Sequence, residues 1–180
     1  MKNLIIKLLI TIYLFGLFSS SAFAETKLKV IVLDFQLNDL TDLPNAPEEL
    51  ARIAYLSATY KQQLLAMGVE VLPANDKLDS YLTTQSATYL FDNVEHAAIL
   101  AAGSGADYLL IGVALKPTYL FVYPRILLID IKTQKVVMAI AAQLESSWSD
   151  NNTTARTAEK LAKIVSDALN KIQAQNTISQ

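Results

Sequence analysis

Polar side chains that could bind a ligand gather just after the first strongly apolar run of the chain. They are Asp34, Asn38, Asp39 and Asp42. In open α/β sheets, ligands bind outside the carboxyl ends of the strands, so these oxygens could hold an ion or a small molecule there. The alternative is an ordinary loop, because Asp and Asn are common turn residues whose side chains bond nearby backbone amides. We favour the ordinary loop and keep ligand binding as the second interpretation.

Asp34 is harder to assign to a loop. It interrupts the apolar run 27–35, and a carboxylate buried in such a strand needs a partner. Arg52 or Lys116 could supply the opposite charge. We therefore predict that Asp34 is structural and that Asp34→Asn lowers the stability by roughly 1–3 kcal/mol.

The other residues with reactive chemistry are too isolated to form a site. His96 is the only histidine; on a helix it would share a face with Asp92 but not with Glu95, which is fewer ligands than zinc requires. Ser104 lies in Gly-Ser-Gly and not in the Gly-x-Ser-x-Gly motif of serine hydrolases. The chain has no cysteine and no glycine-rich phosphate loop. We predict no catalytic residue, no metal site and no cofactor.

Trp148, the only tryptophan, lies in "ESSWSDNN" between the last predicted strand and the last predicted helix. A large aromatic ring at this place can staple the helix to the edge of the sheet, or it can anchor an interface with another protein. We favour the staple, because the junction needs an apolar side chain and the neighbouring residues are polar.

The first 24 residues are typical of a cleaved signal peptide. Lys2 and Lys7 precede the apolar run 8–18, and Ala22-Phe23-Ala24 provides a small-x-small cleavage site. The apolar run is shorter than the roughly 20 residues that span a bilayer. Cleavage removes both lysines and lowers the formal net charge from −2 to −4, which gives no basic face for nucleic acid or anionic lipid. We expect a soluble periplasmic protein that starts at Glu25 and has neither a lipid-bearing cysteine nor a membrane span.

Residues 25–175 are predicted to form a single α/β domain, with a flexible tail at 176–180. Apolar runs predict strands and 3.6-residue periodicity predicts helices. The strands are expected at 27–35, 69–73, 106–116, 119–131 and 135–148, and the helices at 45–67, 78–82, 93–102 and 153–172. The order β-α-β-α-β-β-β-α indicates an α/β (α+β) fold in which three to four helices pack on a mixed five-stranded sheet.

Three segments, "VIVLDFQLNDL", "GADYLLIGVALK" and "ESSWSDNNTTARTAEKLAKIV", resemble a family of secreted proteobacterial proteins of unknown function. The strand order and "GADYLLIG" are also similar to the amino-terminal domain of TolB and, more distantly, to the curli-secretion lipoprotein. This resemblance implies a TolB-like fold used for assembly and interaction, not for catalysis. The chain departs from the family where Asn93 and His96 replace a Cys-x-x-Cys pair and where Gln134 replaces a turn glycine.

The leading hypothesis is a non-catalytic periplasmic module that binds an unidentified protein partner in an envelope or secreted-protein assembly. The alternative is a periplasmic protein that binds a small ligand or an ion through the acidic loop after the first strand. The candidates for interaction or structural roles are Asp34, Asp39, Arg52, Lys116 and Trp148.

Overall fold

The computed structural model describes residues 27–144 and 150–178. The predicted signal peptide and Trp148 lie outside the described residues. Within these ranges the strands are β1 (Lys29–Val32), β2 (Gln36–Asp39), β3 (Glu70–Leu72), β4 (Tyr108–Lys116), β5 (Tyr123–Asp130) and β6 (Lys135–Ala141). The helices are α2 (Pro47–Ala66), α3 (Asp76–Thr84), α4 (Tyr89–Asp92), α5 (Val94–Ala101) and α6 (Asn151–Ile178).

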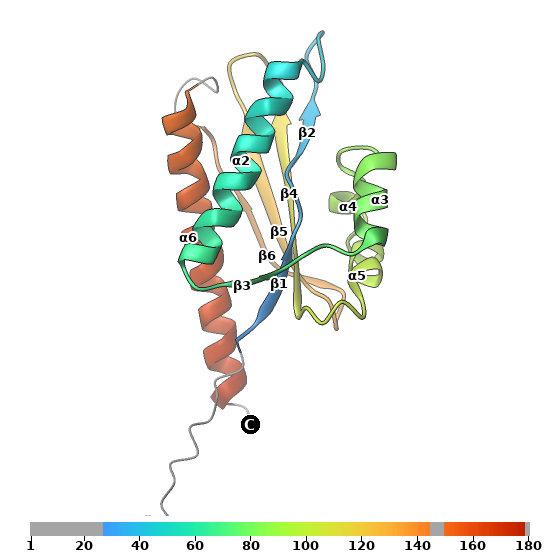
Figure 1. The fold of residues 1–180 in the computed structure, drawn as a ribbon, viewed down its shortest axis with the longest axis vertical. Helices are drawn as coiled ribbons and strands as arrows, with labels where there is room; N and C mark the ends of the chain where they lie inside the picture. Colours follow the sequence, from blue (N-terminus) through green and yellow to red (C-terminus); the bar gives the residue numbers. More distant parts are fainter. Residues whose placement is uncertain (1–26, 145–149, 179–180) are drawn as a thin grey trace, which may run out of the picture.

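One mixed sheet runs through the centre of the molecule (Figure 1). Its strand order is β3-β1-β4-β5-β6, and β2 also pairs with β4. β3, β1 and β4 are parallel, whereas β4, β5 and β6 form the antiparallel meander that the sequence predicts. "GADYLLIG" leads into β4, whose first five residues, Tyr108 to Gly112, are all buried. The prediction of a mixed α/β fold is confirmed.

The first predicted strand, 27–35, contains β1 and a β-bulge, and the chain then continues as β2, so the sheet has six strands and not the five predicted. Between the pairs Val32–Leu110 and Gln36–Val113, the first chain advances four residues while β4 advances three. The extra residue lies within 33–35, and such an insertion bends a strand without ending it. The chain therefore continues as β2 through a segment that was predicted to be a loop.

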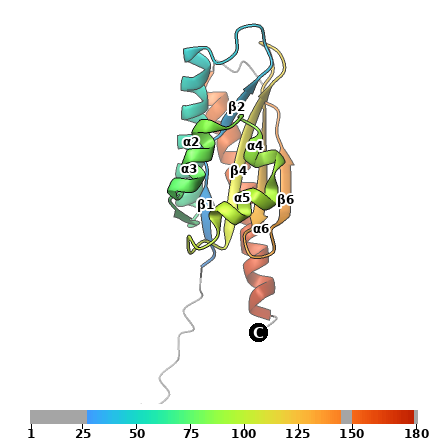
Figure 2. The same ribbon diagram turned by 90° about the vertical axis from the view of Figure 1, so that its right-hand side faces the viewer.

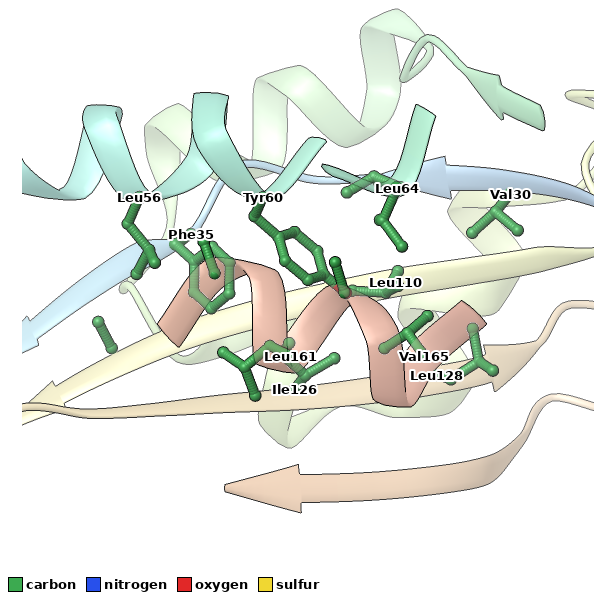
Figure 3. Packing of buried hydrophobic residues seen from close by; sticks show 14 of the residues in the cluster. Val30, Phe35, Leu56, Tyr60, Leu64, Leu110, Ile126, Leu128, Leu161 and Val165 are labelled. Atoms are coloured by element: carbon green, nitrogen blue, oxygen red, sulfur yellow. The ribbon is translucent and has the colours of Figure 1, made fainter. Parts of the chain in front are cut away.

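Helices cover both faces of the sheet, with α2 and α6 on one face and α3, α4 and α5 on the other (Figures 1 and 2). Buried apolar side chains form one hydrophobic cluster on each face, the α2/α6 cluster and the α3–α5 cluster. Successive side chains of a strand point to opposite faces, so Leu110 belongs to the α2/α6 cluster and Leu109 belongs to the α3–α5 cluster. Figure 3 shows the α2/α6 cluster, where Tyr60 of α2 and Leu161 of α6 meet Ile126 of the sheet.

Of the predicted ends of α2 and α6, one is confirmed and the other is wrong. Gly68 ends α2 as predicted: its φ is +82°, its N–H donates to the Leu65 carbonyl, and the Val69 N–H donates to the Leu64 carbonyl. This is the Schellman arrangement, which favours glycine. Helix α6 continues to Ile178 and does not end at the predicted residue 172.

The helix count also differs from the prediction of three to four. Within the described ranges there are five, because the segment after β3, where the sequence was least readable, holds two short helices, α3 and α4. No helix in residues 27–144 or 150–178 combines the length and the apolar character that crossing a bilayer requires.

Candidate functional site: a buried ion network beneath an apolar tip

Three of the candidate residues meet in one cluster. Lys116 ends β4, Asp39 ends β2, and Arg52 lies on α2 beside Glu49. The Lys116 Nζ lies 3.1 Å from Asp39 Oδ2 and 3.4 Å from Glu49 Oε1. The Arg52 Nη1 lies 2.6 Å from the same Glu49 oxygen. We call these four residues the ion network.

The register of the sheet places the centre of the ion network. Asp39 and Lys116 are direct partners on the parallel strands β2 and β4, and the first turn of α2 brings Glu49 to them. The Lys116 side chain is 2% exposed and the Asp39 side chain is 0% exposed. Because these charges are shielded from water, removing Lys116 would leave the Asp39 carboxylate buried without this counter-charge, and removing Asp39 would leave the Lys116 ammonium with Glu49 at 3.4 Å; both changes are destabilising.

Asp39 is held as a carboxylate. Burial alone would raise its pKa, but the Thr41 hydroxyl and the Thr41 N–H donate to its Oδ1 at 2.7 and 3.0 Å. The Lys116 ammonium donates to its other oxygen. These donors outweigh the burial and lower the pKa of Asp39 below its ordinary value of 3.8. Both oxygens are therefore occupied by structural partners.

The prediction that Asp34 is a buried carboxylate paired with Arg52 or Lys116 is wrong. Its side chain is 62% exposed and pairs with Lys61 of α2 at 2.8 Å. The bulge is the physical reason. In a regular strand Asp34 would point into the α2/α6 core, as Val32 does, but the extra residue turns it outward and gives the inward position to Phe35.

The ion network connects two loops that carry exposed apolar side chains. The Leu40 N–H donates to the Lys116 carbonyl at 3.0 Å, and the Lys116 Nζ lies 5.3 Å from the centre of the Tyr119 ring. The β2–α2 and β4–β5 loops lie at the same end of the molecule, uppermost in Figure 1. Their exposed apolar residues, which we call the apolar tip, are Leu40, Leu43, Tyr119, Leu120 and Phe121.

The residues considered for catalysis or metal binding serve local structure. The His96 Nδ1 lies 3.0 Å from the Tyr89 hydroxyl, and its ring packs edge-on against Tyr81. The Ser104 hydroxyl accepts from the Ala106 N–H. Among the residues that the structure describes, no three His, Cys, Asp or Glu side chains are grouped so that they could hold a metal ion. Trp148 lies outside that part of the chain, so both of its interpretations stay predictions.

Sequence reasoning missed Glu49 and Thr41. Two signals were available: Glu49 and Arg52 are spaced i, i+3 on a predicted helix, where side chains are neighbours, and Asp39-Leu40-Thr41 can form an Asx turn. The partnership with Lys116 was not readable, because it depends on the register that the bulge sets.

Comparison with solved structures gives matches at low identity. The chain is similar to the PelC dodecamer subunit from Paraburkholderia phytofirmans, with 18% identity over 82% of this chain and 90% of that one, and a TM-score of 0.48. It is also similar to lipoprotein GNA1162 from Neisseria meningitidis, with 14% identity over 78% and 99% and a TM-score of 0.46. The LpoB C-terminal domain from Escherichia coli matches with 13% identity over 66% and 82% and a TM-score of 0.41.

Among curated proteins, none matches the sequence significantly. The predicted likeness to TolB and to the curli-secretion lipoprotein stays a prediction. A family model covers residues 28–164, which contain all six described strands, helices α2 to α5 and the first half of α6. That model is DUF3280, described as "Protein of unknown function (DUF2380)". More than half of the chain is matched, so the protein belongs to the DUF3280 family.

Proposed function

We propose that the protein is a non-catalytic interaction module that binds a protein partner through the apolar tip. The observation that carries this proposal is the exposure of large apolar side chains on two adjacent loops: Leu43 is 71% exposed and Leu120 is 74% exposed. Large apolar side chains exposed on neighbouring loops are typical of interaction sites. The ion network beneath it fixes both loops, so less ordering entropy is lost on binding.

The charges around the apolar tip favour a protein partner over an anionic lipid surface. Asp42 and Glu48 are exposed beside the tip, on the β2–α2 loop and in the first turn of α2. Acidic side chains repel anionic headgroups and complement basic ones. The partner should therefore present an apolar patch with Lys or Arg at its rim.

The signal-like segment at residues 1–24 supports a place for this module in the bacterial periplasm, in an envelope or secreted-protein assembly. Binding without catalysis is supported by the roles of Asp39, Glu49, Arg52 and Lys116, whose charges hold loops in place. The alternative, ligand binding by the acidic loop, has less support because the Asp39 carboxylate is already committed to Thr41 and Lys116.

Site-specific photocrosslinking tests the proposal in a host that expresses the full chain. A photoreactive residue at position 120 should capture one defined protein, whereas the same residue at Ile99 should not. Ile99 is a matched control, since it is 56% exposed but lies on α5, away from the tip.

The captured partner is then purified and its affinity is measured directly. Leu43→Ser with Leu120→Ser should weaken binding by at least about tenfold, since central apolar contacts dominate interfaces. Leu65→Ser with Ile99→Ser removes two apolar side chains that are each 56% exposed elsewhere on the molecule and should leave the affinity unchanged. If both double variants weakened partner binding equally, or if neither weakened it, the apolar tip would not be the binding surface.

A further inference from the structure

A second site, independent of the apolar tip, lies at the carboxyl end of β3, beside the bulge that carries β1 on into β2. After β3 the chain passes to α3, on the opposite face of the sheet from α2. β1 and β3 are neighbouring parallel strands, so this edge of the sheet opens between α2 and α3. Ligands of open α/β sheets bind outside the carboxyl ends of the strands.

A cavity of about 330 Å³ occupies this position. It is bounded by the ends of both strands, by α2 and by α3. Apolar side chains that line it include Val71, Leu72 and Leu82, and its charged side chains are Asp34, Lys61 and Asp79. The volume is near the lower limit of ligand pockets, roughly 300–1,000 Å³, which restricts a ligand to a small molecule.

The β-bulge places one wall of this cavity. It turns the Asp34 side chain out of the core toward Lys61, and the flanking Phe35 N–H is fixed by a 2.9 Å bond to the Ser57 hydroxyl. Ser57 and Lys61 are spaced i, i+4 on α2 and therefore share a helix face. Bulges recur next to binding sites because they re-aim a side chain in this way.

The charged groups have capacity left for a ligand. The Asp79 carboxylate makes no hydrogen bond or ion pair with any residue that the structure describes. Asp34 engages Lys61 through Oδ1, a carboxylate has a second oxygen that can accept, and the Lys61 ammonium has three donors. Two carboxylates can receive an ammonium group, Lys61 can receive a carboxylate, and the apolar wall can receive a hydrocarbon side chain.

We propose that this cavity binds a small zwitterion of amino-acid or dipeptide size, with its ammonium on Asp79 and Asp34, its carboxylate on Lys61, and an apolar side chain against Val71, Leu72 and Leu82. The proposal does not rest on the interaction function, since none of these residues belongs to the apolar tip. If the cavity bound no zwitterion, the proposal that the apolar tip binds a protein would still stand, and the reverse also holds.

Titration calorimetry with the purified protein tests the site with named probes. L-Leucine and glycyl-L-leucine should bind saturably. L-Leucinamide, which lacks the carboxylate, and N-acetyl-L-leucine, which lacks the ammonium, should each bind at least about tenfold more weakly, because a hydrogen bond to a charged group is lost. Absence of saturable binding of both zwitterions at millimolar concentration overturns the proposal.

Two variants locate the binding. Lys61→Gln should remove the advantage of L-leucine over L-leucinamide, and Asp79→Asn should remove its advantage over N-acetyl-L-leucine. Lys163→Gln is the matched control, because Lys163 pairs with Asp167 at 3.1 Å on the exposed face of α6. The Lys163→Gln variant should bind L-leucine with the same affinity as the natural protein. Binding that neither Lys61→Gln nor Asp79→Asn changes would place the ligand elsewhere and overturn the proposal.

Discussion

At the scale of single residues, the protein uses two carboxylates of the same strand segment in opposite ways. Asp39 is enclosed with Lys116, whereas Asp34 lies in solvent with Lys61. An exposed ion pair contributes little because water screens it, whereas loss of the buried Asp39 carboxylate removes the nearer of the two counter-charges of the buried Lys116 ammonium. The difference between them is set by burial and not by residue type.

Asp39→Asn and Asp34→Asn form a matched pair that tests this difference. Asp39→Asn should lower the free energy of unfolding by about 2–3 kcal/mol. Asp34→Asn should change it by less than about 0.5 kcal/mol, in contrast to the roughly 1–3 kcal/mol expected from the sequence. Urea unfolding measures both values, and equal effects would contradict the assigned burial.

The contribution of Asp39 should depend on pH in a defined direction. Its pKa is lower in the folded protein than its ordinary 3.8, so the unfolded chain takes up the proton first as the pH falls. The stabilisation is therefore complete above about pH 5 and is lost as the pH falls below 3.8 through the folded pKa. The stability difference between the natural protein and Asp39→Asn should shrink in that acid range. A difference that grows toward low pH would reverse the assignment.

Tyr60 supplies a third test at this scale. Its hydroxyl is buried and has no hydrogen-bond partner among the described residues, and burial raises the pKa of this hydroxyl well above its ordinary value. An unpaired buried hydroxyl costs stability, so Tyr60→Phe should raise the free energy of unfolding by about 1 kcal/mol. Tyr60→Ala removes the ring as well and should instead lose about 3–5 kcal/mol. Thermal or urea unfolding distinguishes the two effects, and a loss with Tyr60→Phe would mean that the hydroxyl has a partner.

At the scale of elements, the side chain of Phe35 packs the bulge between β1 and β2 closely against β4. Phe35, turned inward by the bulge, packs edge-on against Tyr60 at a centroid distance of 5.5 Å (Figure 3). The Phe35 ring also lies against Gly112: a Cβ there would lie 2.6 Å from two Phe35 ring atoms. Glycine is therefore needed at this point of β4 because of close approach and not because of backbone conformation.

Gly112→Ala should consequently destabilise the protein by about 1–3 kcal/mol through overpacking. Phe35→Leu in the same chain removes the clashing ring atoms, so the double variant should lose less than the sum of the two single variants. A double-mutant cycle in urea measures this coupling. Additive losses would mean that the Phe35 ring moves aside freely, and the bulge would then not depend on Gly112.

These contacts also show which parts of the fold a sequence can predict. The α6 stripe, the meander and the Gly68 stop are local patterns, and each was correctly predicted because periodicity and backbone preference act within a few residues. The bulge adds one residue with no local signal, and it moved Asp34 from the core to the surface. Lys116 and Asp39 were both named as candidates, but their pairing is a property of register between distant strands. Their place in the ion network therefore required the structure.

At the scale of the whole molecule, one sheet carries two hydrophobic clusters. The α2/α6 cluster includes Leu110, and the α3–α5 cluster includes Leu109, its neighbour on β4. Both side chains are 0% exposed. Neither helical layer can separate from the sheet without exposing a strand that also forms the other cluster, so the described domain should unfold as one cooperative unit.

Leu109→Ala and Leu110→Ala test this cooperativity from the two faces. Each variant leaves a cavity in a different cluster and should lower the free energy of unfolding by about 2–5 kcal/mol. For each variant, unfolding in urea is followed by far-ultraviolet circular dichroism and by hydrogen exchange, the latter separately in α5 and in α6. All of these measurements should give the same unfolding midpoint. If Leu109→Ala instead released α5 at a lower urea concentration than α6, the α3–α5 layer would be a separate unit of lower stability. The cavity at the end of β3, which lies between α2 and α3, would then open by movement of that layer and not exist as a preformed pocket.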